Sequence, residues 1–353
     1  MGTNNRIFYA CQAVAIVPKT GHRKPTANDV LLGVQSVGLS STFTLDQVFE
    51  LGQIEIYENI EDVADIEVTL EKVIDGHPFI YEHASNFTCR TDLVTASKNR
   101  CDVYLAIYDD GLSHATGIPR NVCWNSGMYT SSVSYNYSVD GSATESVTLV
   151  GNDRMWNDNA GDTALAANNQ WNLAGTQTDA IFDGDHTPKS GVVRRVNVDI
   201  KGSTLPDIVG SQKGPDPTSP RIISSAKHIQ SISVSTDFGQ EQINELGRFG
   251  PYARYATFPI EVTSEFEVIS TSGDLVSVSG STINTSNQAI VIKDTAGTVL
   301  DLGAVAGTSG KNKLSSVSYS GGDTGGGNAS ITYSFSNFNV LTVTSSAANT
   351  AAI

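Results

Sequence analysis

The sequence predicts an all-β protein with only minor helix, made of two tandem copies of one β domain. Three observations predict this. Apolar and polar residues alternate in many short runs, Gly, Asn and Asp separate these runs, and one long stretch occurs twice. Period-two alternation bounded by turn-forming residues is typical of strands that bury one face and expose the other. A length of 353 residues suits two domains.

The expected strands extend along the whole chain, and Asp-Gly turns at residues 75–76, 110–111 and 140–141 separate candidate hairpins. Only short helices are expected, near residues 46–51 and 240–246. The clearest alternating runs are at residues 34–39, 54–57, 66–70, 103–107, 133–137, 147–150, 192–200, 229–234, 260–268, 289–292 and 331–335.

An internal repeat is the most specific signal in the sequence. VQSVGLSSTFTLDQVFELG, beginning at Val34, aligns without a gap with IQSISVSTDFGQEQINELG, beginning at Ile229. Two shorter matches follow in the same order in both halves: IEVT at residues 66–69 and 260–263, and SSVSY at residues 131–135 and 315–319. Three ordered matches indicate a duplicated domain.

The repeat divides the chain into three parts. The first β domain is expected at residues 1–155 and the second at residues 221–353. Residues 156–220 form a polar connector that includes one strand at 192–200, which either copy could take up. Pro and Gly concentrate at residues 204–221, as in an extended linker.

Charge and cysteine usage restrict the partners and the compartment. The formal net charge of -15 argues against a surface that holds nucleic acid tightly, although an acidic wall suits DNA that must slide past. The four cysteines form no CxxC pair, which predicts reduced thiols and assembly in the cytoplasm. The first residues lack the features of a signal peptide, and no apolar run reaches about 18 residues, so no membrane segment is expected.

Motifs of catalysis do not occur in the sequence. There is no GxSxG elbow, no Walker A loop and no GxGxxG between a strand and a helix. The six histidines are scattered without metal-ligand spacing. We therefore expect no enzyme activity, no cofactor and no metal.

A long connection follows the first strand of each repeat copy and carries many apolar side chains. Such a segment must bury them, either against its own sheet or against a neighbouring subunit, and both alternatives stay open. The candidate inter-subunit residues are Phe43, Leu45, Val48, Phe49, Leu51, Ile54 and Tyr57 in the first copy, and Phe238, Ile243, Leu246, Phe249 and Tyr252 in the second.

Three stretches resemble the major tail tube proteins of bacteriophages, in the form with a duplicated domain. They are LGQIEIYENIEDVADIEVTLEKVIDGHPFIY at residues 51–81, ESVTLVGNDRMW at 145–156 and INELGRFGPYARYATFPIEVTSEFEVISTSGD at 243–274. The resemblance covers most of both halves. It does not extend to residues 160–221, and the Gly-rich segment GGDTGGGNAS departs from it.

This resemblance implies a β-sandwich or barrel subunit whose inner strands join a ring-wide β-barrel. Rings would stack into a hollow conduit for DNA from the capsid to the host cell, and three duplicated chains would form a pseudo-sixfold ring. The partners would be further copies of the chain, tail proteins of the tip, the terminator, a sheath or a tape measure, and DNA passing without sequence-specific binding. Assembly would take place in the host cytoplasm, and the product would belong to the virion tail. Lumen-facing candidates are Ser132, Ser134, Asn136 and Ser138.

Other readings of the sequence stay open. The tube could belong to a phage-derived contractile apparatus rather than to a phage tail. A secreted β-sandwich module that binds carbohydrate or another surface ligand would suit the alternating strands and Trp124, Trp156 and Trp171. A hydrolase on a β-sandwich is a third reading, which no motif supports.

Overall fold

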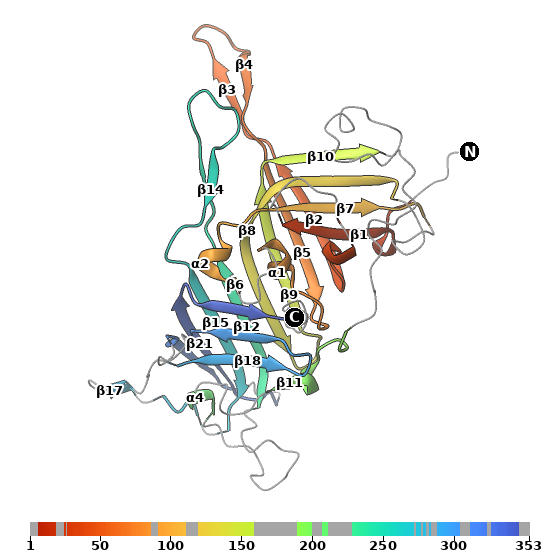
Figure 1. Cartoon of the computed structure of the whole chain (residues 1–353). Helices are drawn as coiled ribbons and strands as arrows, with labels where there is room; N and C mark the ends of the chain where they lie inside the picture. The colour runs from red at the N-terminus through yellow and green to blue at the C-terminus, as the bar shows by residue number, and fades with distance from the viewer. Residues whose placement is uncertain are drawn as a thin grey trace.

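The computed structural model describes residues 6–18, 25, 27–85, 91–110, 119–158, 189–199, 207–210, 228–271, 273–276, 278–279, 282–283, 288–303, 311–322 and 326–345. Over these residues the chain is nearly all strand with little helix, which confirms the predicted all-β class. Figure 1 shows one broad sheet that runs through both halves of the chain, with shorter elements packed on it.

The broad sheet contains a path of eight antiparallel strands that gives the molecule its length. Four strands of the first half are followed across the sheet by four of the second half. In spatial order they are β2 (Val34–Thr42), β5 (Asp65–Val73), β9 (Thr144–Gly151), β8 (Asn121–Ser138), β12 (Ile229–Asp237), β15 (Glu261–Ile269), β21 (Ser330–Phe338) and β20 (Lys313–Ser320).

The two halves repeat the same strand order and the same irregularities. β2, β5, β9 and β8 correspond to β12, β15, β21 and β20, so each half has the order first, second, fourth, third strand. β-Bulges, which are extra residues in one strand of a pair, occur at matching places. They lie between Val34 and Ser36 and between Ile229 and Ser231, and again between Thr130 and Ser132 and between Leu314 and Ser316.

Side-chain contacts repeat as well. Ser36 Oγ donates to Glu71 Oε2 at 3.4 Å, and the corresponding Ser231 Oγ donates to Glu267 Oε2 at 3.1 Å. Glu71 and Glu267 therefore occupy the same position in the second strand of the two copies. The duplication is therefore present in the pairing of the strands and not only in the amino-acid letters.

The turn into the first strand of each copy is also duplicated. Gly33 and His228 both have a positive φ, at 79° and 53°. The side-chain Nε2 of Gln35 donates to the Gly33 carbonyl, and the side-chain Nε2 of Gln230 donates to the His228 carbonyl. A positive φ favours glycine, so this conformation costs little at Gly33 and is less favourable at His228.

The IEVT match is out of register with the structure by two residues. Ile66 pairs with Ser41, and the residue in the same position of the second copy is Val262, which pairs with Thr236. The sequence match alone aligns Ile66 with Ile260. Because strands repeat every two residues, a slide of two keeps every side chain on its face, and the letters alone do not reveal it.

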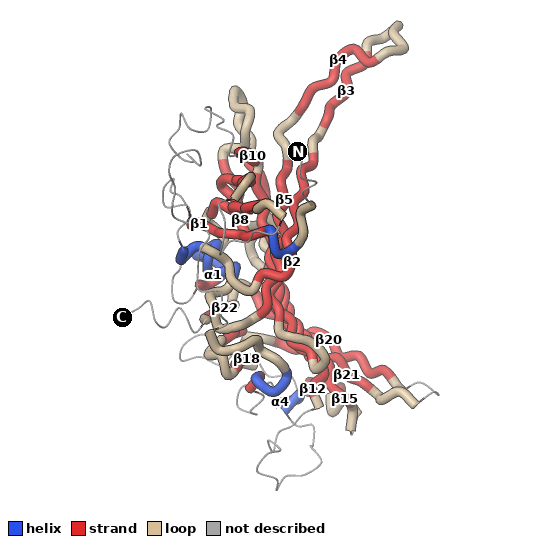
Figure 2. Tube along the Cα trace, turned by 90° about the vertical axis from the view of Figure 1, so that its right-hand side faces the viewer, coloured by secondary structure: helices blue, strands red, loops and turns tan. Residues whose placement is uncertain are grey.

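Further strands and helices cover one face of the broad sheet, and Figure 2 shows them on the same side of it. β1 (Gln12–Pro18) and β7 (Cys101–Ile107) continue the sheet through the first part of β8, which also pairs with β10 (Asp153–Asp158). A second sheet has the order β11 (Val198–Asp199), β18 (Ile290–Asp294), β19 (Val299–Leu302), β22 (Leu341–Thr344) and β6 (Thr91–Asp92). The helices are α1 (Ile80–Ala84), α2 (Leu93–Ala96), α4 (Asp207–Gly210) and the 3-10 turns Tyr9–Cys11, Ala27–Asp29 and Arg195–Asn197, and β16 (Val278–Ser279) pairs with β17 (Thr282–Ile283).

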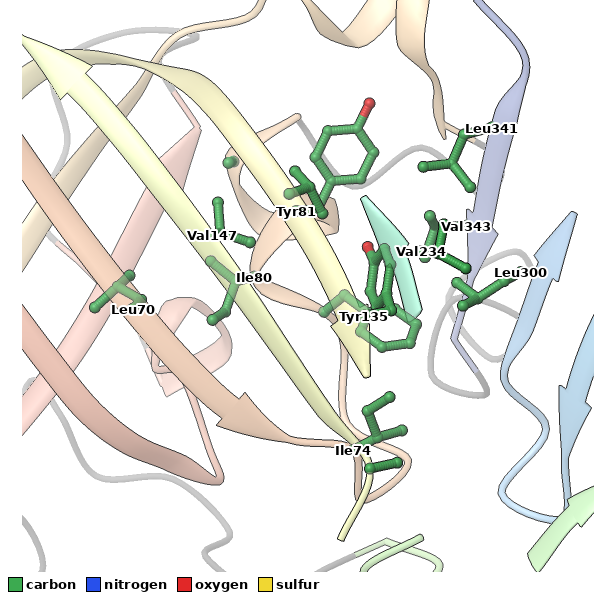
Figure 3. Packing of buried hydrophobic residues seen from close by; sticks show 14 of the residues in the cluster. Leu70, Ile74, Ile80, Tyr81, Tyr135, Val147, Val234, Leu300, Leu341 and Val343 are labelled. Carbon is green, nitrogen blue, oxygen red and sulfur yellow. The ribbon is translucent and has the colours of Figure 1, made fainter. Parts of the chain in front are cut away.

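One hydrophobic core serves both halves. Figure 3 shows Leu70 and Val147 of the first half in the same cluster as Leu300, Leu341 and Val343 of the second. β6 of the first half also pairs with β22 of the second. The two copies are thus packed together, and the expected domain boundaries at residues 155 and 221 remain a prediction.

Three local expectations differ from the structure. The segments near residues 46–51 and 240–246, expected as short helices, begin hairpins: β3 (Leu45–Phe49) pairs with β4 (Ile56–Glu61), and β13 (Glu241–Ile243) pairs with β14 (Ala253–Tyr255). Pairing across each hairpin overrides the weak helical pattern. The strand expected at 192–200 is a 3-10 turn followed by the two-residue β11. Most of the connector lies outside the described residues.

Candidate functional site

One face of the broad sheet carries no second layer among the described residues, and this open face is hydroxylic and acidic. Along β8, Val133, Tyr135 and Tyr137 point into the core. Their neighbours, the four lumen-facing candidates, lie on the opposite, open face, where Ser132, Ser134 and Ser138 are half-buried and Asn136 is exposed. The structure brings these four together on one surface, and their role in a lumen stays a prediction.

Carboxylates form a row on the open face in each copy. They are Glu67 and Glu71 on β5, and Asp237, Glu261, Glu265 and Glu267 on β12 and β15. Within these eight described strands, the basic residue at an outward position is Lys313, at the start of edge strand β20. The open face therefore presents a negative surface over both copies.

Hydroxyl groups beside the carboxylates donate hydrogen bonds to them. Ser334 Oγ donates to Glu265 Oε1 at 3.3 Å, and Thr69 Oγ1 donates to Glu67 Oε1 at 3.4 Å. Where the two copies meet, a shallow depression is lined by Ser132, Ser134, Ser235, Asp237, Glu261 and Thr263. Sequence reasoning missed the acidic rows, although the alternation of β5 and β15 was sufficient to place these glutamates outward.

Two hairpin arms project beyond the sheet at the same end of the molecule (Figure 1). We call residues 43–64 the first arm and residues 238–259 the second arm. In the first arm the seven candidate residues are all exposed, and Leu51 and Ile54 at the tip are 103% and 102% exposed. In the second arm Ile243, Leu246, Phe249 and Tyr252 are exposed. Exposed apolar surface of this extent is typical of interaction sites, and an inter-subunit role for these residues stays a prediction.

Phe238 corrects the expectation for the second arm. It is 0% exposed, because it lies at the joint between the two copies, where its ring contacts that of Tyr81 at 6.2 Å between centroids. Its amide donates to the Ser131 carbonyl at 2.8 Å. Phe238 is therefore a core residue of this chain and is not free for a neighbouring subunit.

The second arm is tied to the first copy, through an ion pair at its base. Arg254 Nη2 lies 2.7 Å from Asp65 Oδ1, and Arg254 Nε donates to Asn152 Oδ1 at 3.1 Å. Gln242 Nε2 also donates to Asp65. These contacts fix the direction of the second arm.

A buried polar cluster holds α1 under the sheet. Glu145 Oε2 accepts from the Ile80 amide at 2.6 Å, and Oε1 accepts from the Tyr81 amide at 3.1 Å and from Tyr135 Oη at 3.2 Å. Burial raises the pKa of Glu145 to about 7. These three donors occupy both carboxyl oxygens of Glu145, so the side chain anchors the helix.

Nearby titratable groups are buried in the same way. Glu82 accepts from the Ser345 amide at 2.9 Å, which links α1 to the strand at the end of the second copy, and burial raises its pKa. Burial lowers the pKa of His83 to about 3. Lys72 Nζ pairs with Asp75 Oδ1 at 2.8 Å.

Potential metal ligands and thiols are dispersed over the described part of the chain. No group of three or more His, Cys, Asp or Glu residues there could hold a metal ion. Cys11, Cys101 and Cys123 are buried and form no disulfide with one another, and Cys89 lies outside the described residues.

None of the helices in the described part of the chain has the length and apolar character that a bilayer crossing requires.

Comparisons with known proteins give only distant similarities. No family model matches the chain, and no curated protein matches it. Among solved structures, it is similar to a chain of the anti-feeding prophage baseplate, with 14% identity and a TM-score of 0.32 over 45% of this chain and 98% of that one. A chain of the anti-feeding prophage cap matches with 13% identity and a TM-score of 0.33, over 45% and 95%. A chain of the sheath–tube complex of PVC, an extracellular contractile injection system, matches with 12% identity and a TM-score of 0.30, over 43% and 92%.

Proposed function

We propose that this chain is a structural subunit of a phage-type tail tube without enzyme activity. Chains associate into rings, rings stack into a hollow tube, and the open face of the broad sheet lines a conduit for DNA. Each ring contains three chains, and thus six copies of the repeat. Alternatively, such a tube belongs to a phage-derived contractile apparatus rather than to a phage tail.

The open face is the observation that carries the proposal. A conduit wall for DNA must be wetted and must not hold phosphates. Ser and Thr hydroxyls hydrate the wall, and the rows around Glu67 and Glu265 repel the DNA backbone at short range. An adhesive DNA-binding surface would carry Lys and Arg in these positions, because phosphate contacts dominate affinity.

The arms support the same function. A subunit that worked alone would gain nothing from Leu51 and Ile54 fully in water, and exposed apolar patches of this kind mark interaction sites. Both arms leave the sheet at one end (Figure 1), so they can reach the neighbouring ring on the side to which they point. The remaining tail partners, at the tip, the terminator and a sheath or tape measure, follow from this role.

The binding-module alternative has less support in the described residues. Trp124 is half-buried and stacks on Tyr104 with ring centroids 6.4 Å apart and planes 6° apart. A tryptophan used in this way does not offer its face to a sugar. Trp156 is 48% exposed, and Trp171 lies outside the described residues.

Negative-stain electron microscopy of the purified protein over a concentration series tests the proposal. We expect hollow tubes or closed rings with threefold or pseudo-sixfold end views. A folded protein that stays monomeric at every concentration would overturn the tube proposal and favour a module that acts alone.

A further inference from the structure

The joint between the two copies is a complete strand-to-strand interface inside one chain. β8 of the first copy pairs antiparallel with β12 of the second, with Ser134 opposite Ser235 and Tyr135 opposite Val234. The end of the joint is closed by Phe238, whose amide donates to the Ser131 carbonyl at 2.8 Å.

The two edges of the broad sheet are the same two strands once more. β20 corresponds to β8, and β2 corresponds to β12, by the matched registers and bulges of the two copies. The path of paired strands ends at β2 on one side and at β20 on the other. Each chain thus carries, at its two ends, the two separate halves of its own internal joint.

Burial differs at corresponding positions, as expected where a partner is missing. Tyr135 is 1% exposed beside β12, whereas the corresponding Tyr319 on edge strand β20 is 55% exposed. Phe238 is 0% exposed at the internal joint, whereas the corresponding Phe43 is 69% exposed. Phe238 is covered by Tyr81 of the first copy, across the joint, and the structure shows no such cover over Phe43 among the described residues. Tyr135 is covered by Phe79 of α1 as well, with ring centroids 5.4 Å apart, so the phenylalanine pair is the clearer sign of a missing neighbour.

We propose that the internal joint is the template for the joint between chains: β20 of one chain pairs antiparallel with β2 of the next, in the register of β8 and β12. Transferred residue by residue, this register places Ser318 opposite Ser40 and Tyr319 opposite Leu39. The Phe43 amide of the next chain then donates to the Ser315 carbonyl, as the Phe238 amide does to Ser131. The inference rests on the proposed function and specifies the surface through which rings form.

The pairing is head-to-tail, because it joins two different edges. Such heterologous interfaces repeat from chain to chain and can close into a ring. Pairing would also remove both exposed sheet edges, which otherwise invite unspecific association. Lys313 at the start of β20 is of the residue type that discourages wrong edge pairing.

The two joints differ in one respect. The internal joint is reinforced by Arg254 of the second arm on Asp65, whose counterpart in the second copy is Glu261. The first arm, residues 43–64, contains no Lys or Arg. The joint between chains therefore lacks this ion pair, and we expect it to separate before the internal one.

Disulfide cross-linking tests the register. Directly opposed residues in an antiparallel pair lie about 4.5–5.5 Å apart between Cα atoms, within the range that a disulfide spans. We would mix full-length Ser318→Cys protein with Ser40→Cys protein, oxidise, and look for dimers on a non-reducing gel. The internal pair Ser134→Cys with Ser235→Cys, in one chain, is the matched positive control. Ser318→Cys mixed with Thr42→Cys is the register control, because diagonal neighbours lie about 7–8 Å apart.

A dimer in the first mixture, and its loss in the register control and in each variant alone, supports the proposal. A dimer with Ser318→Cys alone, or an equally fast dimer in the register control, overturns it. Tubes that form without any dimer overturn this joint and leave the proposed function intact. A protein that forms neither tubes nor dimers, while the internal control oxidises, overturns both.

Discussion

Phe43 and Phe238 occupy corresponding positions after the first strand of each copy, yet Phe238 is buried completely and Phe43 is 69% exposed. The chain covers Phe238 with its own first copy, through the Tyr81 ring and the Ser131 carbonyl. In the proposed ring, the equivalent cover for Phe43 comes from the next chain. This pair of residues therefore separates folding from assembly.

Alanine at position 238 should reduce the stability of the single chain, whereas alanine at position 43 should reduce assembly. Phe238→Ala leaves a cavity in the core and should lower the free energy of unfolding by about 3–5 kcal/mol, whereas Phe43→Ala should change it by less than about 0.5 kcal/mol. Phe43→Ala should instead reduce the amount of sedimenting assembly. Urea unfolding of dilute protein and sedimentation of concentrated protein give the two readouts. Equal stability losses in both variants would show that Phe43 is covered within its own chain.

The tip of the first arm should control the stacking of rings. Leu51→Asp or Ile54→Asp places a charge on a residue that is fully exposed in the single chain. We expect stability to be unchanged and tubes to be lost, because a buried unpaired carboxylate opposes the contact between rings. Gln53→Asp adds the same charge between them and is the control. Tubes of normal length from Leu51→Asp and Ile54→Asp would exclude the arm tip from stacking contacts.

The sequence predicts much of this fold, for physical reasons. Alternation predicts the strands at residues 66–70 and 147–150, because each has one buried and one open face. The matches around Val34 and Ile229 predict that two strands share a role. They do not predict that the copies join into one sheet, because such pairing depends on contacts between distant segments.

The candidate site was harder to predict. The apolar connection after the first strand has the same kind of sequence in both copies. The exposure of Leu51 and Ile54 agrees with the prediction that this connection contacts a neighbour, whereas the burial of Phe238 does not. Phe238 differs because the Tyr81 ring and the Ser131 carbonyl of the first copy contact it. A contact between residues so far apart in sequence leaves no local signal.

Charge reversal on the open face should convert a passive wall into an adhesive one. The double variant Glu71→Lys with Glu265→Lys places one lysine on the open face of each copy. We expect salt-dependent binding of DNA that the unmodified protein lacks, with a slope of about 0.9 in log-log form for each phosphate contacted. Fluorescence anisotropy with labelled duplex DNA measures it. Glu50→Lys with Glu245→Lys, on the arms, makes the same change in net charge, and equal binding by that control would mean that net charge alone is responsible.

Removing the buried carboxylate of Glu145 should change how stability depends on pH. Burial raises its pKa from 4.5 to about 7, so the folded state keeps its proton where the unfolded state has lost it. Such a group contributes stability that is complete below pH 4.5 and is lost as pH rises through 7. A shift of this size corresponds to about 3 kcal/mol. In Glu145→Gln this loss is absent, so the free energy of unfolding of the variant should gain on that of the unmodified protein as pH rises across the window.

Urea unfolding at intervals between pH 4.5 and 8 checks this expectation. Glu82 and His83 also titrate, but they are present in both proteins, so the difference between the two curves isolates Glu145. Ser146→Ala, at the neighbouring outward position of β9, removes no titratable group and should give a curve parallel to that of the unmodified protein. A Glu145→Gln curve that is also parallel would mean that Glu145 is ionised in the folded chain at pH 5. The three donors from Ile80, Tyr81 and Tyr135 would then offset the cost of burying its charge.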